Sequence, residues 1–275
     1  MIWIHPELAG LLGEGRQAWQ RVFSLEGEVY RAPPGSGRRT LRFEHAGRGY
    51  FLKLHWGVGW GEILKNLITL KRPVLGARNE WRAIQRLDEL GVETMDLVAY
   101  GEQGANPATR RSFVITRELT DSISLEDYCR DWVRQPPPVA AKHAILQRVA
   151  QMTAALHENG VNHRDLYICH FLLRQPWDGS AQALHLFLID LHRVQIRAAT
   201  PLRWQVKDLA ALHYSSLRIG LTKRDLLRFV KVYCGRPLRE SLRQDQALWQ
   251  AVLGRSRRLQ WRDPEADAAR GDGHA

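Results

Sequence analysis

The sequence predicts a two-lobed α+β fold, with a small antiparallel sheet in the first lobe and a mainly helical second lobe. Short β-leaning segments separated by turn residues occur before about Leu119, and segments with helical periodicity dominate after it. A length of 275 residues suits one large or two small domains, at roughly 150 residues per domain. We assign residues 1–19 to an N-terminal leader, 20–118 to the first lobe, 119–262 to the second lobe, and 263–275 to a disordered tail.

The first lobe is expected to begin as a meander of three short strands. The β-leaning runs occupy residues 28–30, 39–43 and 49–54, and turn-rich stretches separate them. A helix is predicted over residues 77–90, because apolar residues recur there every three or four positions. Gly91 follows this helix at the position of a left-handed cap.

Two further strands, at residues 95–100 and 112–116, complete the predicted first lobe. Ser124 is expected to cap a helix that runs to about Trp132. The clearest helix covers residues 141–159, where apolar residues follow one another at spacings of four, three and four. The second lobe is therefore expected to begin with helices.

A predicted β-hairpin follows this long helix and carries three polar residues. Two apolar strands lie on either side of an Asp-Gly turn, which is typical of a hairpin. In an antiparallel hairpin, the start of the first strand and the end of the second lie at the same open end. We therefore expect Asp165, His170 and Asp190 to come together.

This group of residues suits phosphoryl transfer from ATP. The transition state spreads negative charge over phosphate oxygens, so a kinase supplies a metal, carboxylates, a cation and a base. Asp165 would accept the proton of the acceptor hydroxyl, and His170 and Asp190 would hold Mg2+. Lys53, aligned by Glu80, would bind the α- and β-phosphates. These five residues occur along the chain in the order found in protein-kinase-like enzymes.

From about Gly27 to Arg239, the sequence resembles the lipopolysaccharide kinase family. The stretches that carry the resemblance most specifically are residues 49–55, 57–63, 73–78 and 163–173. The resemblance implies a protein-kinase-like fold that uses ATP and Mg2+. It also implies phosphorylation of O-4 of the first heptose of the lipopolysaccharide core, on a lipid A-Kdo-heptose acceptor, in a Gram-negative cell.

The resemblance implies further roles for single residues. It supports the base, the phosphate-binding ion pair and the metal-binding Asp190 given above. Glu118 and Leu119 would lie at the hinge where adenine hydrogen-bonds to the backbone, and Asp208 would match the buried Asp that steadies the catalytic loop. His170 stands where protein kinases have Asn, so direct metal ligation and an outer-shell role both stay open.

The segment after Asp190 is short and basic. It lacks the signature of a long activation loop, which argues against a peptide substrate. Its arginines, Arg193, Arg197 and Arg203, are predicted to bind phosphate and carboxylate groups of an inner-core saccharide through bidentate contacts.

The charge of the chain indicates an anionic partner. The 40 Lys and Arg residues, of which only seven are Lys, face 29 Asp and Glu, and the formal net charge is +11. ATP, the glycolipid and an anionic membrane surface are candidates, and the resemblance adds an acidic acyl carrier protein. No apolar run reaches the ~18 to 20 residues of a spanning helix, and no signal peptide is recognised. We therefore expect a cytoplasmic protein, peripheral at the inner face of the inner membrane.

Two alternatives stay open at this point. One is a kinase for another acceptor, either the Kdo sugar or a small molecule such as an aminoglycoside. The other is a non-catalytic pseudokinase or nucleic-acid-binding module that uses the charge of +11. The second alternative lacks a recognised nucleic-acid-binding motif in the sequence, so we place nucleic acid behind the kinase interpretation.

Overall fold

The computed structural model describes residues 1–32, 37–57, 59–68 and 76–262. The chain divides into two compact units. Unit 1 comprises Met1–Glu89, Thr94–Thr120 and Leu191–Arg193. Unit 2 comprises Leu90–Glu93, Asp121–Asp190 and the chain from Val194 onward. The predicted tail at 263–275 and part of the predicted family stretch at 73–78 lie outside the described residues.

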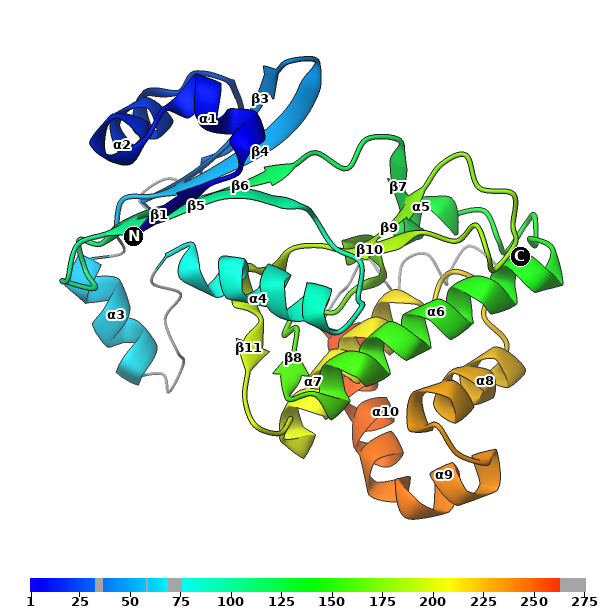
Figure 1. The fold of residues 1–275 in the computed structure, drawn as a ribbon. Helices are drawn as coiled ribbons and strands as arrows, with labels where there is room; N and C mark the ends of the chain where they lie inside the picture. Colours follow the sequence, from blue (N-terminus) through cyan, green and yellow to red (C-terminus); the bar gives the residue numbers. More distant parts are fainter. Residues whose placement is uncertain (33–36, 58, 69–75, 263–275) are drawn as a thin grey trace. The chain divides into compact units, whose positions relative to one another are not determined.

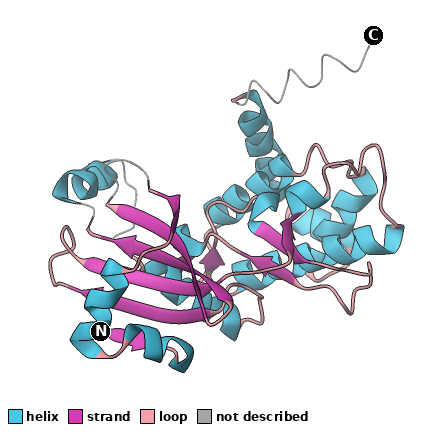
Figure 2. Ribbon diagram, turned by 90° about the horizontal axis from the view of Figure 1, so that it is seen from above, coloured by secondary structure: helices cyan, strands magenta, loops and turns pink. Residues whose placement is uncertain are grey.

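Unit 1 is built on one antiparallel six-stranded sheet (Figure 2), in the order β1-β5-β6-β4-β3-β2. The strands are β1 (Ile2–Ile4), β2 (Glu28–Arg31), β3 (Arg38–His45), β4 (Arg48–His55), β5 (Leu97–Gln103) and β6 (Arg111–Arg117). The predicted meander is confirmed, because β2 pairs with β3 and β3 pairs with β4. The two further predicted strands correspond to β5 and β6, which pair with each other.

Helices cover both faces of this sheet (Figure 1). Among the helices α1 (Pro6–Leu12), α2 (Gly15–Ser24), α3 (Gly59–Ile68) and α4 (Arg78–Glu89), α1 and α2 lie over one face and α4 over the other. Leu8 of α1 and Val22 of α2 share a buried core with Leu52 and Phe113 of the sheet. Val114 belongs to a second cluster that packs toward α4. Because neighbouring strand residues point to opposite faces, each face has its own core.

The N-terminal residues 1–19, expected to precede the first lobe, lie within unit 1. β1 pairs with β5 through the partners Ile2 and Gly101, and it extends the sheet at one edge. β1 has three residues and α1 has seven. Segments this short carry too few residues to establish a period of 2 or of 3.6, so the sequence pattern did not predict them.

Unit 2 is mainly helical and contains two small sheets. Its helices are α5 (Leu125–Tyr128), α6 (Val139–Glu158), α7 (Leu202–Ser215), α8 (Lys223–Cys234), α9 (Leu238–Gln244) and α10 (Gln246–Trp261). One sheet has the order β10-β9-β7, and the other pairs β11 with β8. The strands are β7 (Ser122–Ser124), β8 (Val161–Asn162), β9 (Phe171–Arg174), β10 (Leu186–Leu188) and β11 (Gln195–Ile196).

The predicted features at the start of unit 2 are largely confirmed. Ser124 caps α5, because its hydroxyl accepts a hydrogen bond from the Asp127 amide at 3.0 Å. The helix ends at Tyr128 and not near Trp132. The chain continues there in turns, one of which is closed by a hydrogen bond from the Trp132 amide to the Cys129 carbonyl. β9 and β10 form the predicted hairpin.

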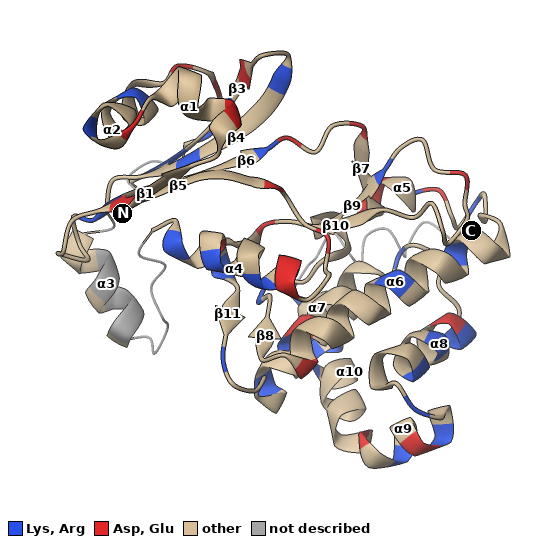
Figure 3. Ribbon diagram, viewed as in Figure 1, with Lys and Arg blue, Asp and Glu red and all other residues tan. Residues whose placement is uncertain are grey.

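The core of unit 2 lies among α6, α7, α8 and α10, where Ala150, Leu209, Tyr233 and Val252 pack together. The basic residues are spread over several elements, including α4, α6, α8 and α9 (Figure 3). Among the described helices, none combines the length and apolar character required to cross a membrane.

Gly160 ends α6 in a conformation that few other residues adopt. Its φ angle is 74°, and its carbonyl accepts a hydrogen bond of 2.9 Å from the Arg197 amide. A Cβ atom at Gly160 would lie 1.8 Å from the Arg197 carbonyl oxygen. This close approach brings the segment after β11 against the start of β8.

We predict that Gly160→Ala lowers the free energy of unfolding by roughly 3 kcal/mol or more, because it adds a backbone clash to left-handed strain. Gly235→Ala is the matched control. Gly235 has a φ angle of 63° and also caps a helix, but a Cβ atom there would meet no neighbouring group of the described chain within 4 Å. Urea denaturation should show a loss of only about 1 kcal/mol for the control. Equal losses for the two variants would contradict the close approach.

Candidate active site

The predicted ion pair between Lys53 and Glu80 is present in unit 1. Leu52 and Leu54, the neighbours of Lys53 on β4, are buried in the core beneath α1 and α2. Lys53 therefore points to the face covered by α4, where Glu80 lies in the first turn. Lys53 Nζ lies 2.6 Å from Glu80 Oε1, and Glu80 is only 1% exposed.

Glu118 and Leu119 follow the end of β6 in unit 1. The Glu118 amide donates a hydrogen bond of 2.9 Å to the Gly49 carbonyl, and Arg42 Nε lies 2.8 Å from Glu118 Oε1. The Glu118 side chain is thus bound by Arg42. The backbone of this segment is therefore the part predicted to bind adenine. That role stays a prediction.

Asp208 of α7 fixes the backbone of residues 163–165 in unit 2, which form the predicted catalytic loop. Its Oδ2 accepts a hydrogen bond of 2.6 Å from the His163 amide, and its Oδ1 accepts one of 2.8 Å from the Arg164 amide. Asp208 is fully buried. Hydrogen bonds from two amides compensate a buried carboxylate for the water that it has lost. The chain is therefore held immediately before Asp165, as the resemblance implied for Asp208.

His163 has a structural position beside this contact. Its side chain is buried, and its Nε2 lies 2.9 Å from the Ile189 carbonyl. Burial lowers the pKa of His163 below its usual value, so the ring is neutral near pH 7. A neutral imidazole whose Nε2 faces a carbonyl donates its proton there. His163 thus joins the catalytic loop to the residue that precedes Asp190.

The structure brings Asp165, His170 and Asp190 together, as predicted. His170 Nδ1 donates a hydrogen bond of 2.7 Å to the Asp165 carbonyl, because a carbonyl can only accept. In the neutral ring, Nε2 then carries a lone pair, and it lies 3.6 Å from Asp190 Oδ2. A ring nitrogen with a lone pair and a carboxylate oxygen that face each other can both donate electron pairs to a metal cation.

This donor set fits a magnesium ion that is also bound by nucleotide phosphates. The described residues contain no group of three or more His, Cys, Asp or Glu side chains arranged to hold a metal. Mg2+ usually takes only one or two protein carboxylates and completes its shell with phosphates and water. A metal-binding imidazole commonly donates its other N–H to a carbonyl, as His170 does. Asp190 and His170 therefore remain the predicted metal residues.

Two residues of this region have positive φ angles, which are uncommon for residues other than glycine. Arg164 has a φ angle of 76° and Asp190 one of 62°. Such conformations cost energy and persist where the surroundings hold them, which is common at functional sites. Here the Asp208 carboxylate holds the Arg164 amide, and the Asp190 side chain faces the His170 ring.

The three arginines predicted to bind the acceptor belong to different units. Arg193 belongs to the short helix Leu191–Arg193 of unit 1. In unit 2, the guanidinium carbons of Arg197 and Arg203 lie 5.6 Å and 5.4 Å from the centre of the Trp204 ring. Their acceptor-binding role stays a prediction.

Sequence reasoning missed Lys207, whose Nζ lies 3.9 Å from Asp165 Oδ1. Lys207 also lies 5.8 Å from the centre of the Trp204 ring. Residues three apart on a helix share a face. The spacing of Trp204 and Lys207, just before Asp208, was therefore the available signal.

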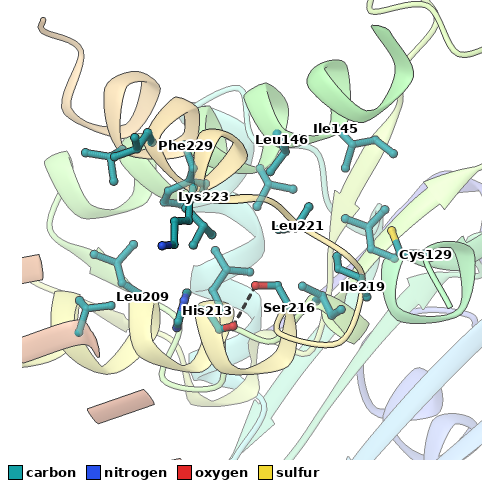
Figure 4. Close-up of a pocket in the computed structure, with 18 of the residues that line it drawn as sticks. Cys129, Ile145, Leu146, Leu209, His213, Ser216, Ile219, Leu221, Lys223 and Phe229 are labelled. Carbon is teal, nitrogen blue, oxygen red and sulfur yellow. Dashed lines mark hydrogen bonds between the residues drawn. The ribbon is translucent and has the colours of Figure 1, made fainter. Parts of the chain in front are cut away.

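Unit 2 also contains an apolar cavity of about 380 Å³ that the sequence did not predict (Figure 4). Aliphatic side chains such as Ile145, Leu146 and Leu221 line it. Burial lowers the pKa of His213 and raises that of Cys129 to about 12, so both of these lining groups are uncharged near pH 7. Lys223 contributes a cation to the lining. The cavity thus suits an apolar ligand with a polar or anionic end.

Comparisons with known proteins place these features in a family context. A model of the lipopolysaccharide kinase (Kdo/WaaP) family matches residues 20–233. A lipopolysaccharide core heptose(I) kinase WaaP from Pseudomonas aeruginosa is 55% identical over 237 residues, which cover 86% of this chain and 88% of that protein. A protein of the same name from Escherichia coli K12 is 51% identical over 251 residues, covering 91% and 94%.

A solved structure of WaaP in complex with acyl carrier protein resembles this chain with a TM-score of 0.81 and 46% sequence identity. The match covers 94% of this chain and 99% of that chain. The likeness therefore extends over both units.

We predict that Asp208→Asn lowers the free energy of unfolding by about 2 kcal/mol, because the amide side chain can accept only one of the two backbone hydrogen bonds. The loosened catalytic loop should also reduce phosphoryl transfer by the folded enzyme. Asp225→Asn is the matched control. Asp225 is also buried and accepts a 2.9 Å hydrogen bond from the Thr222 amide, but it caps α8.

Thermal unfolding and activity measured on the same samples separate the two effects. The control should lose stability and keep its turnover number when it is assayed well below its melting temperature. Retention of full activity by Asp208→Asn would contradict the role of Asp208 in fixing the catalytic loop.

Proposed function

The chain belongs to the lipopolysaccharide kinase (Kdo/WaaP) family, and we propose that it transfers the γ-phosphate of ATP to O-4 of the first heptose of the lipopolysaccharide core. The names of the relatives, which are core heptose(I) kinases, support this acceptor. The observation that carries the proposal is the catalytic loop, in which Asp208 fixes the backbone just before Asp165. The proposed acceptor is a lipid A-Kdo-heptose molecule.

Asp165 is the proposed base. Its carboxylate would accept the proton of the heptose hydroxyl as that oxygen bonds to the γ-phosphorus and the bond from phosphorus to the ADP oxygen breaks. A base must lie within hydrogen-bonding distance of the hydroxyl, so its position matters as much as its basicity. The hydrogen bonds to the loop around Asp165 supply that fixed position.

The remaining predicted residues would act on the phosphates. Lys53, held by Glu80 at 2.6 Å, would bind the α- and β-phosphates of ATP. Mg2+, when bound by Asp190 and His170, would neutralise part of the phosphate charge. Glu118 and Leu119 would bind adenine through the backbone. Glu80 is almost fully buried beside Lys53, so the ion pair draws the Lys53 ammonium toward α4.

The reaction is proposed to occur at the cytoplasmic face of the inner membrane, where the chain would bind as a peripheral protein. The charge of +11 supports attraction to an anionic lipid surface, at about 1 kcal/mol for each basic side chain near that surface. The amphiphilic acceptor itself would keep the enzyme at the membrane.

We predict that Asp165→Asn reduces the turnover number by about 100-fold or more, because an amide cannot accept the proton. The assay uses ATP, Mg2+ and core lipopolysaccharide that lacks the heptose phosphate, and 31P NMR locates the phosphate on the product. Asp178→Asn is the control, because Asp178 is exposed in the turn of the β9-β10 hairpin and Asn can keep its hydrogen bond to the Ser180 amide.

Undiminished transfer by Asp165→Asn would overturn the assignment of the base. A product that carries its phosphate on Kdo, or on any position other than heptose O-4, would overturn the acceptor. The control variant should match the wild type in both measurements.

We also propose that an acyl carrier protein binds this chain and inserts its acyl chain into the apolar cavity of unit 2. The related solved structure is a complex with such a carrier, which supports the partner. A cavity of about 380 Å³ with mostly aliphatic walls suits a flexible hydrocarbon chain. A net positive charge of +11 would favour association with an acidic protein.

We predict that acylated carrier raises the melting temperature of the wild-type protein, whereas the carrier without an acyl chain raises it far less. Leu146→Trp, which fills part of the cavity, should remove this difference. Val139→Trp is the matched control, because it lies on the same helix and Val139 is 64% exposed. Equal stabilisation by the two carrier forms would show that the acyl chain does not enter the cavity.

A further inference from the structure

Four cations surround the indole ring of Trp204 at the start of α7. The guanidinium carbons or ammonium nitrogen lie between 5.4 Å and 5.8 Å from the ring centre. These cations belong to Arg164, Arg197, Arg203 and Lys207. All of them lie in unit 2, but they come from the catalytic loop, from the segment after β11 and from α7. The cluster is therefore assembled by the fold.

Each distance lies within the range of a cation–π contact, in which the ring face attracts the positive charge. Two charges that lie within 5.8 Å of one point are separated by no more than twice that distance. Like charges at such separations repel one another, so the fold gathers positive charge at this ring. The cation–π contacts with the indole offset part of the repulsion. We call Trp204 and its four cations the Trp204 cluster.

Contacts within unit 2 fix the members of the cluster. Arg197 Nη1 donates a hydrogen bond of 2.6 Å to Asn162 Oδ1. Arg164 is 8% exposed, and its amide is held by Asp208. Arg203 differs from these two, because it is exposed and forms no ion pair or hydrogen bond with the described part of the chain. The cluster thus has fixed cations and an exposed one that a ligand can reach.

The Trp204 cluster adjoins the proposed base through Lys207, whose Nζ lies 3.9 Å from Asp165 Oδ1. The carbonyl oxygen of Asp165 makes a separate contact, because it accepts a hydrogen bond from His170, whose other ring nitrogen faces Asp190. His170, one of the predicted metal residues, therefore contacts the main chain of Asp165, whereas Lys207 of the Trp204 cluster lies near its carboxylate. The hydroxyl of the acceptor must also reach that carboxylate.

We infer that the Trp204 cluster binds a carboxylate or phosphate group of the acceptor saccharide, next to the hydroxyl that is phosphorylated. This inference rests on the proposed kinase function. Arg197 and Arg203 were predicted from the sequence to bind the acceptor, and the cluster adds Arg164, Trp204 and Lys207 to them. Planar guanidinium groups recognise both anions through paired hydrogen bonds. The cluster therefore selects an acceptor that carries a negative charge beside its reactive hydroxyl.

Arg203→Gln tests the inference, because the substitution removes no hydrogen bond or ion pair within the described residues and only the cation–π contact with Trp204. Arg257→Gln is the control, since Arg257 is an exposed arginine on α10 and the substitution removes the same charge. We expect Arg203→Gln to raise the KM for the acceptor about tenfold and to leave the turnover number and the KM for ATP nearly unchanged. The control should leave all three values unchanged.

Modified acceptors identify the anionic group. Wild-type enzyme is assayed with an acceptor whose sugar carboxylates are reduced to alcohols, and with one whose existing phosphates are removed. The acceptor that lacks the recognised group should show a raised KM with the wild type and no further rise with Arg203→Gln. If both modified acceptors still respond to Arg203→Gln as the native one does, the inference is overturned.

Direct binding separates this inference from the proposed function. Titration calorimetry with the acceptor saccharide, in the absence of ATP, should show about tenfold weaker binding to Arg203→Gln than to the wild type or to Arg257→Gln. Equal binding to all three proteins, or a rise in the KM for ATP in place of that for the acceptor, would overturn the anion site. If the wild type transfers no phosphate but the two arginine variants still differ in binding as expected, the kinase assignment is overturned and the anion site is not.

Discussion

The contact between Asp208 and the catalytic loop supports much of what surrounds the candidate active site. A fully buried carboxylate is costly unless hydrogen bonds compensate for its lost hydration, and the His163 and Arg164 amides provide two. His157 Nε2 lies 3.5 Å from the same carboxylate, and His157 Nδ1 lies 2.8 Å from the Tyr233 hydroxyl. The loop is thereby connected to α6, α7 and α8, and the packing of the helical core determines where Asp165 lies.

The same contact accounts for the strained backbone at Arg164. For one carboxylate to bind two successive amides, those amides must point to the same side, and Arg164 adopts a φ angle of 76° there. Asp165 follows directly and is held at its carbonyl by His170. Transfer of a proton from an alcohol requires a base in a fixed position. The strain is therefore maintained by buried contacts and has a direct consequence for the proposed chemistry.

The residues that could be predicted from sequence are those whose chemistry shows in the local pattern. Lys53 lies on an alternating strand and Glu80 on a periodic helix, so their pairing followed from topology and from the cost of a buried charge. The N-terminal elements are too short for a periodic signal, and residues 1–19 were separated from unit 1 for that reason. The spacing of Trp204 and Lys207 places them on one helix face, but the proximity of Lys207 to Asp165 and the apolar cavity depend on how α7 packs against distant segments.

The structure also changes the meaning of the arginine excess. Several arginines of unit 1 are neutralised locally, as in the pairs of Arg117 with Glu7 and Arg78 with Glu102, both at 2.8 Å. These pairs hold elements together and contribute little attraction for a ligand. At Trp204, several cations gather around an indole ring. A carboxylate partner would compete with an anionic ligand, whereas the uncharged ring contacts the exposed Arg203 without adding a competing negative charge. Net charge therefore indicates an anionic partner, but the location of the partner's site depends on where the fold gathers cations, and Arg203 is an exposed cation at Trp204.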